Sequence, residues 1–294
     1  MRITSGHIAE LATTATSRAQ SKVATATEVA SSGLRVARPS DDPAAWAAAQ
    51  RDKVREALAT GTGAAIQTST AQLQQTDGAL STIADVVEKA RQLAVQGASD
   101  TNANERGELG LQVQALFSAA LSAANAQASD GSYLLAGAKT QTAPFDASGA
   151  YQGDAATRSV VTSEHGSDAV SVSGSLLTAA NGVDVLPELA KLATALSSNN
   201  VAGIQSSLST LTSATDQLSL ARAHAGVGLA ALSDAEGARQ QLALHLTASV
   251  SNLVEADAVT SISDLSQASQ ALDVTRAVAA SVVSVLSHLT NTNG

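Results

Sequence analysis

The sequence contains no cysteine, only four prolines and only 2% aromatic residues in a chain of 294 residues. Without cysteine the chain cannot form disulfides, Cys-ligated zinc sites, iron–sulfur clusters or a thiol nucleophile. Large cores draw much of their buried area from aromatic side chains, so an aromatic-cored enzyme is excluded. Small and aliphatic residues replace them, which is typical of long alanine-rich helices packed at close range. No apolar run approaches the roughly 18 residues of a membrane-spanning helix.

The charge balance is acidic, with 26 Asp and Glu against 17 Lys and Arg and a formal net charge of −9. A nucleic-acid-binding protein normally shows a basic stripe, and the sequence has none, so we expect no nucleic-acid partner. The start of the chain, Met1–Ser5, leads into polar residues and lacks the apolar core of a secretory signal. If the protein is exported, we therefore expect a route other than general secretion.

The N-terminal half has the periodicity of amphipathic helices. Apolar residues at steps of three and four predict a helix over about residues 5–35, with a narrow stripe made mostly of alanine. A second helix is predicted from Pro43 to about residue 96, and a third to about residue 126, begun by a capping box of Asn102 and Glu105. The residues expected on the apolar side of the second helix are Trp46, Val54, Leu58, Ile66, Leu73, Leu80, Ile83, Val87, Ala90 and Leu93.

A stiff turn is predicted between the first two helices. Each proline of Arg38-Pro39-Ser40-Asp41-Asp42-Pro43 disfavours helix in the residue before it. An aspartate followed by proline is typical of a helix N-terminus. We therefore expect the second helix to begin at Asp41 or Asp42.

The residue pattern from about residue 128 to 183 differs from that of the helical regions. It predicts a small β-rich insert with its own aromatic core. Short strands are expected at Tyr133–Gly137, at Ser159–Thr162 and at Ala169–Val172. Residues 164–168 would form the loop of a hairpin between the last two strands.

Helical periodicity returns after Pro187, with a short helix to about Ser198 and a long region from about residue 201 to 289. The fold predicted for the whole chain is mainly α with a small β-rich insert. It is an elongated nested helical rod whose N- and C-terminal helices form a coiled coil, with a β domain at the tip. The expected domains are a terminal coiled-coil assembly domain (1–42 and 255–294), a helical rod domain (43–128 and 184–254) and a β-rich insert domain (129–183).

No catalytic spacing is present: phosphate loops, dinucleotide-binding glycines, HExxH and GxSxG are all lacking. The five histidines, His7, His165, His224, His245 and His288, are not spaced as helical metal ligands. Asp41 and Asp42 are explained by helix capping. We expect no enzymatic activity, no cofactor and no metal.

The terminal helices carry apolar stripes that need a partner, which is either each other or another copy of the chain. Near the C-terminus the spacing is close to seven residues per two turns, as in a coiled-coil seam. The candidate assembly residues are Ile8, Leu11, Val23, Ile262, Leu265, Leu272, Val282, Leu286 and Leu289. Because these stripes lack large anchors, we expect residues 1 to about 40 and about 255 to 294 to be largely disordered in a free monomer.

Three stretches resemble the bacterial flagellin superfamily. Ser32–Ala44 is similar to the family's S-G-x-R-x-x-x-P-S-D-D-P motif, through Gly33, Arg35, Pro39, Ser40, Asp41, Asp42 and Pro43. A second set resembles the signature of the junction proteins in this family: Tyr133, Gly137, Thr140, Pro144, Phe145, Tyr151, Gly153 and Asp154. The third stretch is Ala223–Leu229 on the return helix.

The resemblance implies a structural protein of the bacterial flagellum, located outside the cell after export by the flagellar type III apparatus. The implied partners are an export chaperone, hook-associated protein 1 on the hook side, flagellin on the filament side, and further copies of the chain in a closed ring of about eleven. The alternatives are a short filament flagellin and, less in keeping with the motifs, a soluble coiled-coil type III secretion tip or adaptor protein.

Overall fold

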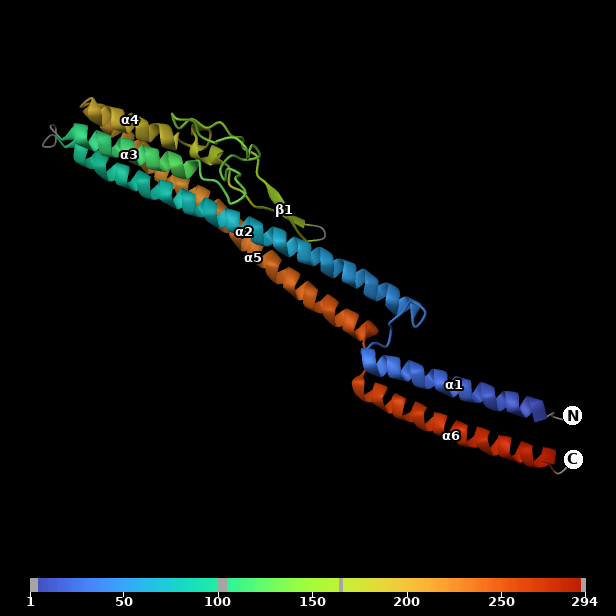
Figure 1. Cartoon of the computed structure of the whole chain (residues 1–294). Helices are drawn as coiled ribbons and strands as arrows, with labels where there is room; N and C mark the ends of the chain where they lie inside the picture. Colours follow the sequence, from blue (N-terminus) through green and yellow to red (C-terminus); the bar gives the residue numbers. More distant parts are fainter. Residues whose placement is uncertain (1–4, 100–104, 164–165, 292–294) are drawn as a thin grey trace. The chain divides into compact units, whose positions relative to one another are not determined.

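The computed structural model describes residues 5–99, 105–163 and 166–291 (Figure 1). The described chain is mainly helical with a small β element, which confirms the predicted fold class. It divides into two compact units. Unit 1 comprises residues 1–57 and 243–294, and unit 2 comprises residues 58–242.

Unit 1 pairs the first and last helices of the chain. Helices α1 (Ser5–Ser32) and α6 (Ala258–Asn291) lie side by side in antiparallel directions (Figure 1). The unit also holds the start of α2 (Pro43–Ala98) and the end of α5 (Val201–Val254). Its small core contains Val36, Ala45, Ala49 and Val254, with Trp46 packed against it.

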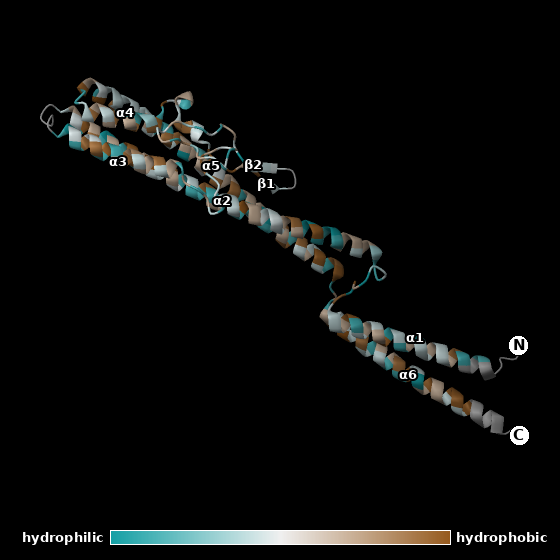
Figure 2. Cartoon of the chain, turned by 45° about the horizontal axis from the view of Figure 1, so that its top comes forward, coloured by the Kyte–Doolittle hydropathy of each residue, from teal (hydrophilic) through white to brown (hydrophobic). Residues whose placement is uncertain are grey.

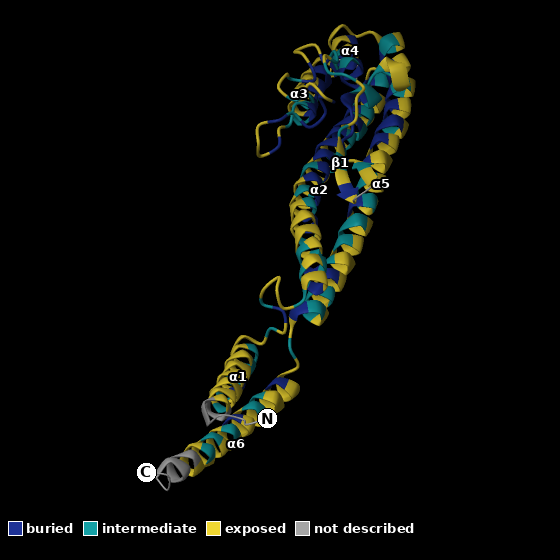
Figure 3. Cartoon of the chain, turned by 90° about the vertical axis from the view of Figure 1, so that its right-hand side faces the viewer, coloured by how far each residue is buried: buried dark blue, intermediate teal, exposed yellow. Residues whose placement is uncertain are grey.

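Unit 2 is a helical bundle around a larger apolar core. The rest of α2 and α5 pack with α3 (Arg106–Ala124) and α4 (Val185–Ser197). Buried residues repeat at coiled-coil spacing on both long helices. They include Ile66, Leu73, Leu80 and Val87 of α2 and Ile204, Leu211, Leu218 and Ala225 of α5. Figure 3 shows buried residues, in dark blue, along both α2 and α5.

The second helix differs from the sequence prediction at its N-terminal end. Val54 and Leu58 were expected on the apolar side, but both are exposed, with Leu58 at 67%. The buried positions in this stretch are the small residues Ala59 and Gly63. The guanidinium of Arg239 on α5 lies against Gly63, where a Cβ atom would be 2.7 Å from Nε. Because the polar Arg239 side chain lies between α2 and α5 here, the apolar seam between the two helices does not continue past Gly63.

The start of α3 also differs from the prediction. Glu105 was expected inside the helix as part of a capping box, but it immediately precedes the helix and makes no side-chain capping bond. Asn102, its expected partner, lies outside the described residues. The connection is instead held by Arg106, which is buried and donates to the carbonyls of Gly97 and Ser99 and to the Asn199 side chain. The α2–α3 and α4–α5 turns are therefore tied together.

The insert contains one antiparallel hairpin, β1 (Ser159–Ser163) and β2 (Gly166–Ala169), together with two 3₁₀ helices, η2 (Gly174–Leu177) and η3 (Ala179–Asn181). A hairpin was predicted here, but its second strand was expected at Ala169–Val172, whereas β2 ends at Ala169. Residues 166–168, which were expected in the loop, belong to β2 and pair with β1. Glu164 and His165 in its loop lie outside the described residues.

The strand predicted at Tyr133–Gly137 is wrong. Tyr133 makes a single bridge with Gln127, and the remaining residues form bends and a turn. Gly137 has a φ of +70°, which is incompatible with an extended strand. Backbone groups of this segment bond instead to irregular segments, such as the Thr140 carbonyl, which accepts from Tyr133 N–H at 2.9 Å.

Candidate assembly site

Helices α1 and α6 face each other along a seam of small residues. The partly or fully buried positions on α1 are Ala12, Thr16, Ala19, Val23, Ala26, Val29 and Ala30. Those on α6 are Ser261, Leu265, Ala268, Leu272, Thr275, Ala279 and Val282. Apart from Val29, both sets follow a spacing of alternating three and four residues, which is the geometry of a coiled-coil seam. Because most members are Ala, Ser or Thr, the two helices can approach closely while burying little apolar area per turn.

The structure divides the candidate assembly residues between two faces. Val23, Leu265, Leu272 and Val282 lie in the seam, whereas Ile262 points away from it and is 64% exposed. Leu11 is also exposed. The side chains of Ile8, Leu286 and Leu289 lie outside the described residues.

Helix α6 carries apolar residues outside the seam as well. Its exposed large aliphatic residues are Val259, Ile262, Val274, Val278, Val283 and Val285. Figure 2 shows hydrophobic residues recurring along this helix. A groove of about 450 Å³ runs beside the seam, with Lys22 and Asp264 among its lining residues. Exposed apolar residues concentrated on one helix are typical of a surface that is covered in an assembly.

The first family motif, Ser32–Ala44, forms a compact connection between α1 and α2, which we call the elbow. Gly33, with φ +68°, ends the helix and accepts a hydrogen bond from Ala256 N–H at 2.9 Å. Arg35 then crosses to the end of α5, where its backbone N–H donates to the Val254 carbonyl at 2.8 Å and its guanidinium to the Leu253 carbonyl at 2.6 Å. A cation at a helix C-terminus complements the helix dipole. These bonds join the residues that follow α1 to those at the end of α5.

The two aspartates of the motif cap the next element. Asp41 Oδ2 accepts from the backbone N–H groups of Ala37 and Arg38 at 3.0 and 2.8 Å, which closes the turn. Asp42 Oδ1 accepts from Ala45 N–H at 3.0 Å at the start of α2, as predicted. That bond, together with the side-chain bond from Arg35, lowers the pKa of Asp42.

The second set of motif residues lies in unit 2 and builds the irregular part of the insert. The Tyr151 hydroxyl lies 2.7 Å from the Asp154 carbonyl oxygen, 3.1 Å from that of Leu135 and 3.0 Å from Ser173 Oγ. Burial is the largest cause that raises the pKa of this hydroxyl. Asp154 Oδ1 in turn accepts from Ala138 N–H at 2.8 Å. These residues hold three segments of the insert together.

The remaining signature residues support the same network. The Phe145 ring packs against Tyr151 with ring centroids 5.1 Å apart, and the Pro144 carbonyl accepts from Gln152 N–H at 2.7 Å. Gly153 and Gly137 each lie where a Cβ would collide, with the Tyr151 hydroxyl and with Asp154 respectively. The signature thus has a folding role that spacing in the sequence does not reveal.

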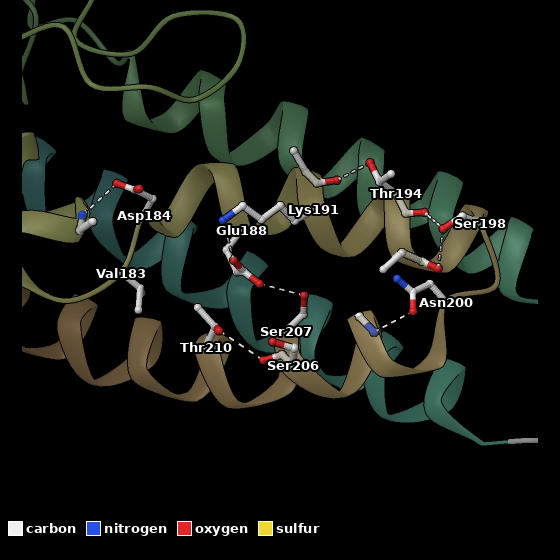
Figure 4. Close-up of a pocket in the computed structure, with 14 residues that line it drawn as sticks. Val183, Asp184, Glu188, Lys191, Thr194, Ser198, Asn200, Ser206, Ser207 and Thr210 are labelled. Atoms are coloured by element: carbon white, nitrogen blue, oxygen red, sulfur yellow. Dashed lines mark hydrogen bonds and ion pairs between the residues drawn. The ribbon is translucent and has the colours of Figure 1, made fainter.

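One cavity of unit 2 lies beside α4 and α5. The cavity of about 770 Å³ beside α4 and α5 is lined mainly by Ser, Thr and Ala with Glu188 and Lys191 (Figure 4). Glu188 accepts from Ser207 Oγ at 2.8 Å and pairs with Lys191 at 3.4 Å, so its charge is used in joining α4 to α5. Among residues 5–99, 105–163 and 166–291, no group of three His, Asp or Glu side chains could hold a metal ion. Within the same ranges, no helix has the length and apolar character to cross a membrane.

Residues 4–140 match the family model of the bacterial flagellin N-terminal helical region. This match covers α1, the elbow, α2 and α3, and it confirms the resemblance to the flagellin superfamily. The chain is also 32% identical over 130 residues to flagellar hook-associated protein 3 of Salmonella typhimurium and of Escherichia coli. The matches cover 43% and 44% of this chain. The chain spans 40% and 41% of the length of these curated relatives.

Solved structures share the fold over a larger part of the chain. A putative flagellar hook-associated protein from Vibrio parahaemolyticus superposes with a TM-score of 0.67 at 18% identity, over 73% of this chain and 100% of that chain. FlgL from Bacillus cereus gives 0.58 at 18% identity, over 68% and 96%. FlgL from Xanthomonas campestris gives 0.59 at 15% identity, over 69% and 99%. The relatives found are flagellar structural proteins.

Proposed function

We propose that this chain is a structural subunit of the bacterial flagellum that joins the hook to the filament and assembles through α1 and α6. The observation that carries the proposal is the α1–α6 pair itself. The seam between the two helices consists mostly of small residues, and the outer face of α6 exposes valines such as Val274 and Val278. Exposed apolar surface of this kind is stabilised when neighbouring subunits cover it. Similarity to proteins named hook-associated protein 3 supports the place of the subunit in the flagellum.

The partners follow from the same proposal. Copies of the chain would form a closed ring of about eleven, bounded by hook-associated protein 1 on the hook side and by flagellin on the filament side. An export chaperone would hold the terminal helices before assembly, and the flagellar type III apparatus would deliver the chain to the outside of the cell. Residues 1–42 and 255–294 would then be the assembly domain, 43–128 and 184–254 the rod, and 129–183 the insert.

The inner and outer residues of unit 1 have different roles in this proposal. The seam residues, including Leu272, keep α1 and α6 together, and the outward residues contact other subunits. Arg35 and Asp42 stabilise the elbow, because Arg35 donates both to Asp42 and to the Leu253 carbonyl. No reaction is required of any of these groups.

The test is complementation of a motile bacterium that lacks its own hook–filament junction protein. The chain should restore swimming, whereas Val274→Asp combined with Val278→Asp should leave cells that shed flagellin into the medium, because charges would replace the outward apolar contact. Gln267→Asp, at an exposed polar position on the same helix, is the matched control and should restore swimming. Helix content by circular dichroism should be equal in all three proteins.

Full motility of the double aspartate variant would overturn the assembly role of this face. Purified chain added to filament seeds separates the junction role from that of a filament flagellin. The junction proposal fails if the chain elongates the seeds into long filaments by itself.

A further inference from the structure

Helix α5 carries a charged residue at the position where its buried stripe would continue. Residues at every seventh position of this helix are fully buried: Ile204, Leu211, Leu218, Ala225 and Leu232. The next position in this series is Arg239, whose side chain is only 18% exposed. Coiled-coil seams favour an apolar residue at such a position, and a polar residue there lowers stability.

The charge of Arg239 is satisfied along its own helix. Its Nε and Nη2 donate to the two carboxylate oxygens of Glu236, one turn earlier, at 2.7 and 2.6 Å. Gln240 Nε2 donates to the same carboxylate at 2.8 Å. Because these three bonds join residues of α5 to one another, they persist when the segment of α2 that lies opposite moves away.

Helix α2 is intrinsically weak at the same level. Gly61 and Gly63 lie within one turn, and glycine is among the least favourable residues in a helix interior. Gly63 is required by the packing, because a Cβ there would lie 2.7 Å from Arg239 Nε. Gly61 is exposed, and a Cβ there would meet nothing within 4 Å. Gly61 therefore weakens the helix without serving a contact.

Apolar burial is small in this part of α2. Ile66, one turn further on, belongs to the core of unit 2, whereas Leu58 is exposed, as is Leu242 of α5. The buried members of residues 58–65 are Ala59 and Gly63, which have little or no side chain. Segments with few buried apolar contacts open locally at low free energy.

We propose that residues 58–65 of α2 form a conformational joint, which loses and regains helical structure while the core of unit 2 stays packed. The Arg239–Glu236 pair keeps the free energy of this opening low, because it enters water with its hydrogen bonds intact and leaves no unpaired charge. An apolar residue at position 239 would instead lose its burial on opening. This inference goes beyond the proposed function, since it concerns the single chain in dilute monomer.

Hydrogen exchange of the unmodified full chain in increasing, subdenaturing urea gives the first test. Amides of residues 58–65 should exchange at a rate that changes little with urea, because local opening exposes little surface. Amides near Leu80 and Val87 should exchange faster as urea rises, because their exchange requires unfolding of the core. Equal urea dependence of the two sets overturns the proposal.

Two exposed glycines of α2 supply a matched pair of variants. Gly78, like Gly61, has nothing within 4 Å of a Cβ. Gly61→Ala should slow the exchange of residues 58–65 about fivefold, because alanine stabilises the helix against local opening. Gly78→Ala should change that exchange by less than about twofold, because residue 78 lies outside the opening segment. Equal effects of the two variants overturn the joint.

The role of Arg239 is tested by Arg239→Leu combined with Glu236→Gln. Exchange of residues 58–65 should slow about fivefold, since burial of an apolar side chain outweighs the loss of one ion pair along the helix. The control is Arg222→Leu, which removes an exposed ion pair between α5 and Asp77 of α2 and should leave this exchange unchanged. Circular dichroism should show equal helix content. Faster or unchanged exchange in the double variant overturns the proposed role of Arg239.

Discussion

Replacing Gly137 with alanine should destabilise unit 2 far more than the same replacement of Gly131. Both glycines have a positive φ, +70° and +80°, so alanine at either position costs about 1–2 kcal/mol for left-handed backbone. At Gly131 a Cβ atom meets nothing within 4 Å. At Gly137 it would collide with the carbonyl oxygen and Oδ1 of Asp154.

The collision with Asp154 determines the additional loss of unfolding free energy at Gly137. Asp154 would have to move, and four hydrogen bonds depend on its position. Its Oδ1 accepts from Ala138 N–H at 2.8 Å and from Ala156 N–H at 3.1 Å, and its carbonyl oxygen accepts from the Tyr151 hydroxyl at 2.7 Å and from Ser173 Oγ at 2.6 Å. Each such bond contributes about 1 kcal/mol net. With the backbone cost and the loss of all four bonds, Gly137→Ala should lower the free energy of unfolding by about 5–6 kcal/mol, against about 1–2 kcal/mol for Gly131→Ala.

Urea denaturation of the two variants and the unmodified chain measures this difference. Both tyrosines, Tyr133 and Tyr151, lie in unit 2, and the single tryptophan, Trp46, lies in unit 1, so tyrosine near-UV circular dichroism and tryptophan fluorescence report the two units separately. The tyrosine midpoint should fall strongly for Gly137→Ala, with Trp46 fluorescence changed much less. Equal losses for the two variants would refute the reasoning, because they would show that Asp154 gives way at no cost.

Two further predictions concern pH and local stability. The bond from Arg239, with a second from Gln240, lowers the pKa of Glu236 from 4.5 to about 2. The stabilisation from this pair is therefore fully present above about pH 4.5 and is lost as the pH falls toward 2. The urea midpoint of Glu236→Gln should accordingly fall less than that of the unmodified chain between pH 5 and pH 2, and a parallel fall would contradict the assignment. In hydrogen exchange of dilute monomer, amides of α1 and α6 should exchange much faster than those of α2 between Ile66 and Ala94, because the α1–α6 seam buries mainly small side chains; equal protection would contradict the expected disorder of the free ends.

Several elements could be predicted because their signals are local. The turn before α2 follows from Pro39, Asp42 and Pro43 alone, since proline geometry and capping act within a few residues. The periods of α1, α2 and α5 follow from apolar spacing. The hairpin around Ser159–Ala169 was found by its β-branched residues and turn signals, although β2 was placed too late in the chain.

The errors arose where distant residues determine the outcome. Val54, Leu58 and Ile262 have the period of a buried face, but the structure leaves them exposed. The positions covered nearby are Ala59 and Gly63 on α2, and Ser261 and Leu265 on α6. Tyr133–Gly137 has a strand-like composition, yet no neighbouring strand pairs with it along its length. Its backbone is satisfied by loops such as the one at Thr140. Pairing partners of this kind are not encoded within the segment itself.

The shortage of aromatic residues and cysteine, the helical periods and the family motifs were determined by the sequence, since each depends on residue identity or short-range spacing. The tertiary structure decided which faces are covered and what the motif residues do. It brought Gly137, Tyr151 and Asp154 into one hydrogen-bonded contact, and it separated the inner seam of α6 from the outer valines proposed to bind other subunits. Periodicity states which side chains share a helix face, but burial depends on what lies opposite that face, and only the packed structure supplies that.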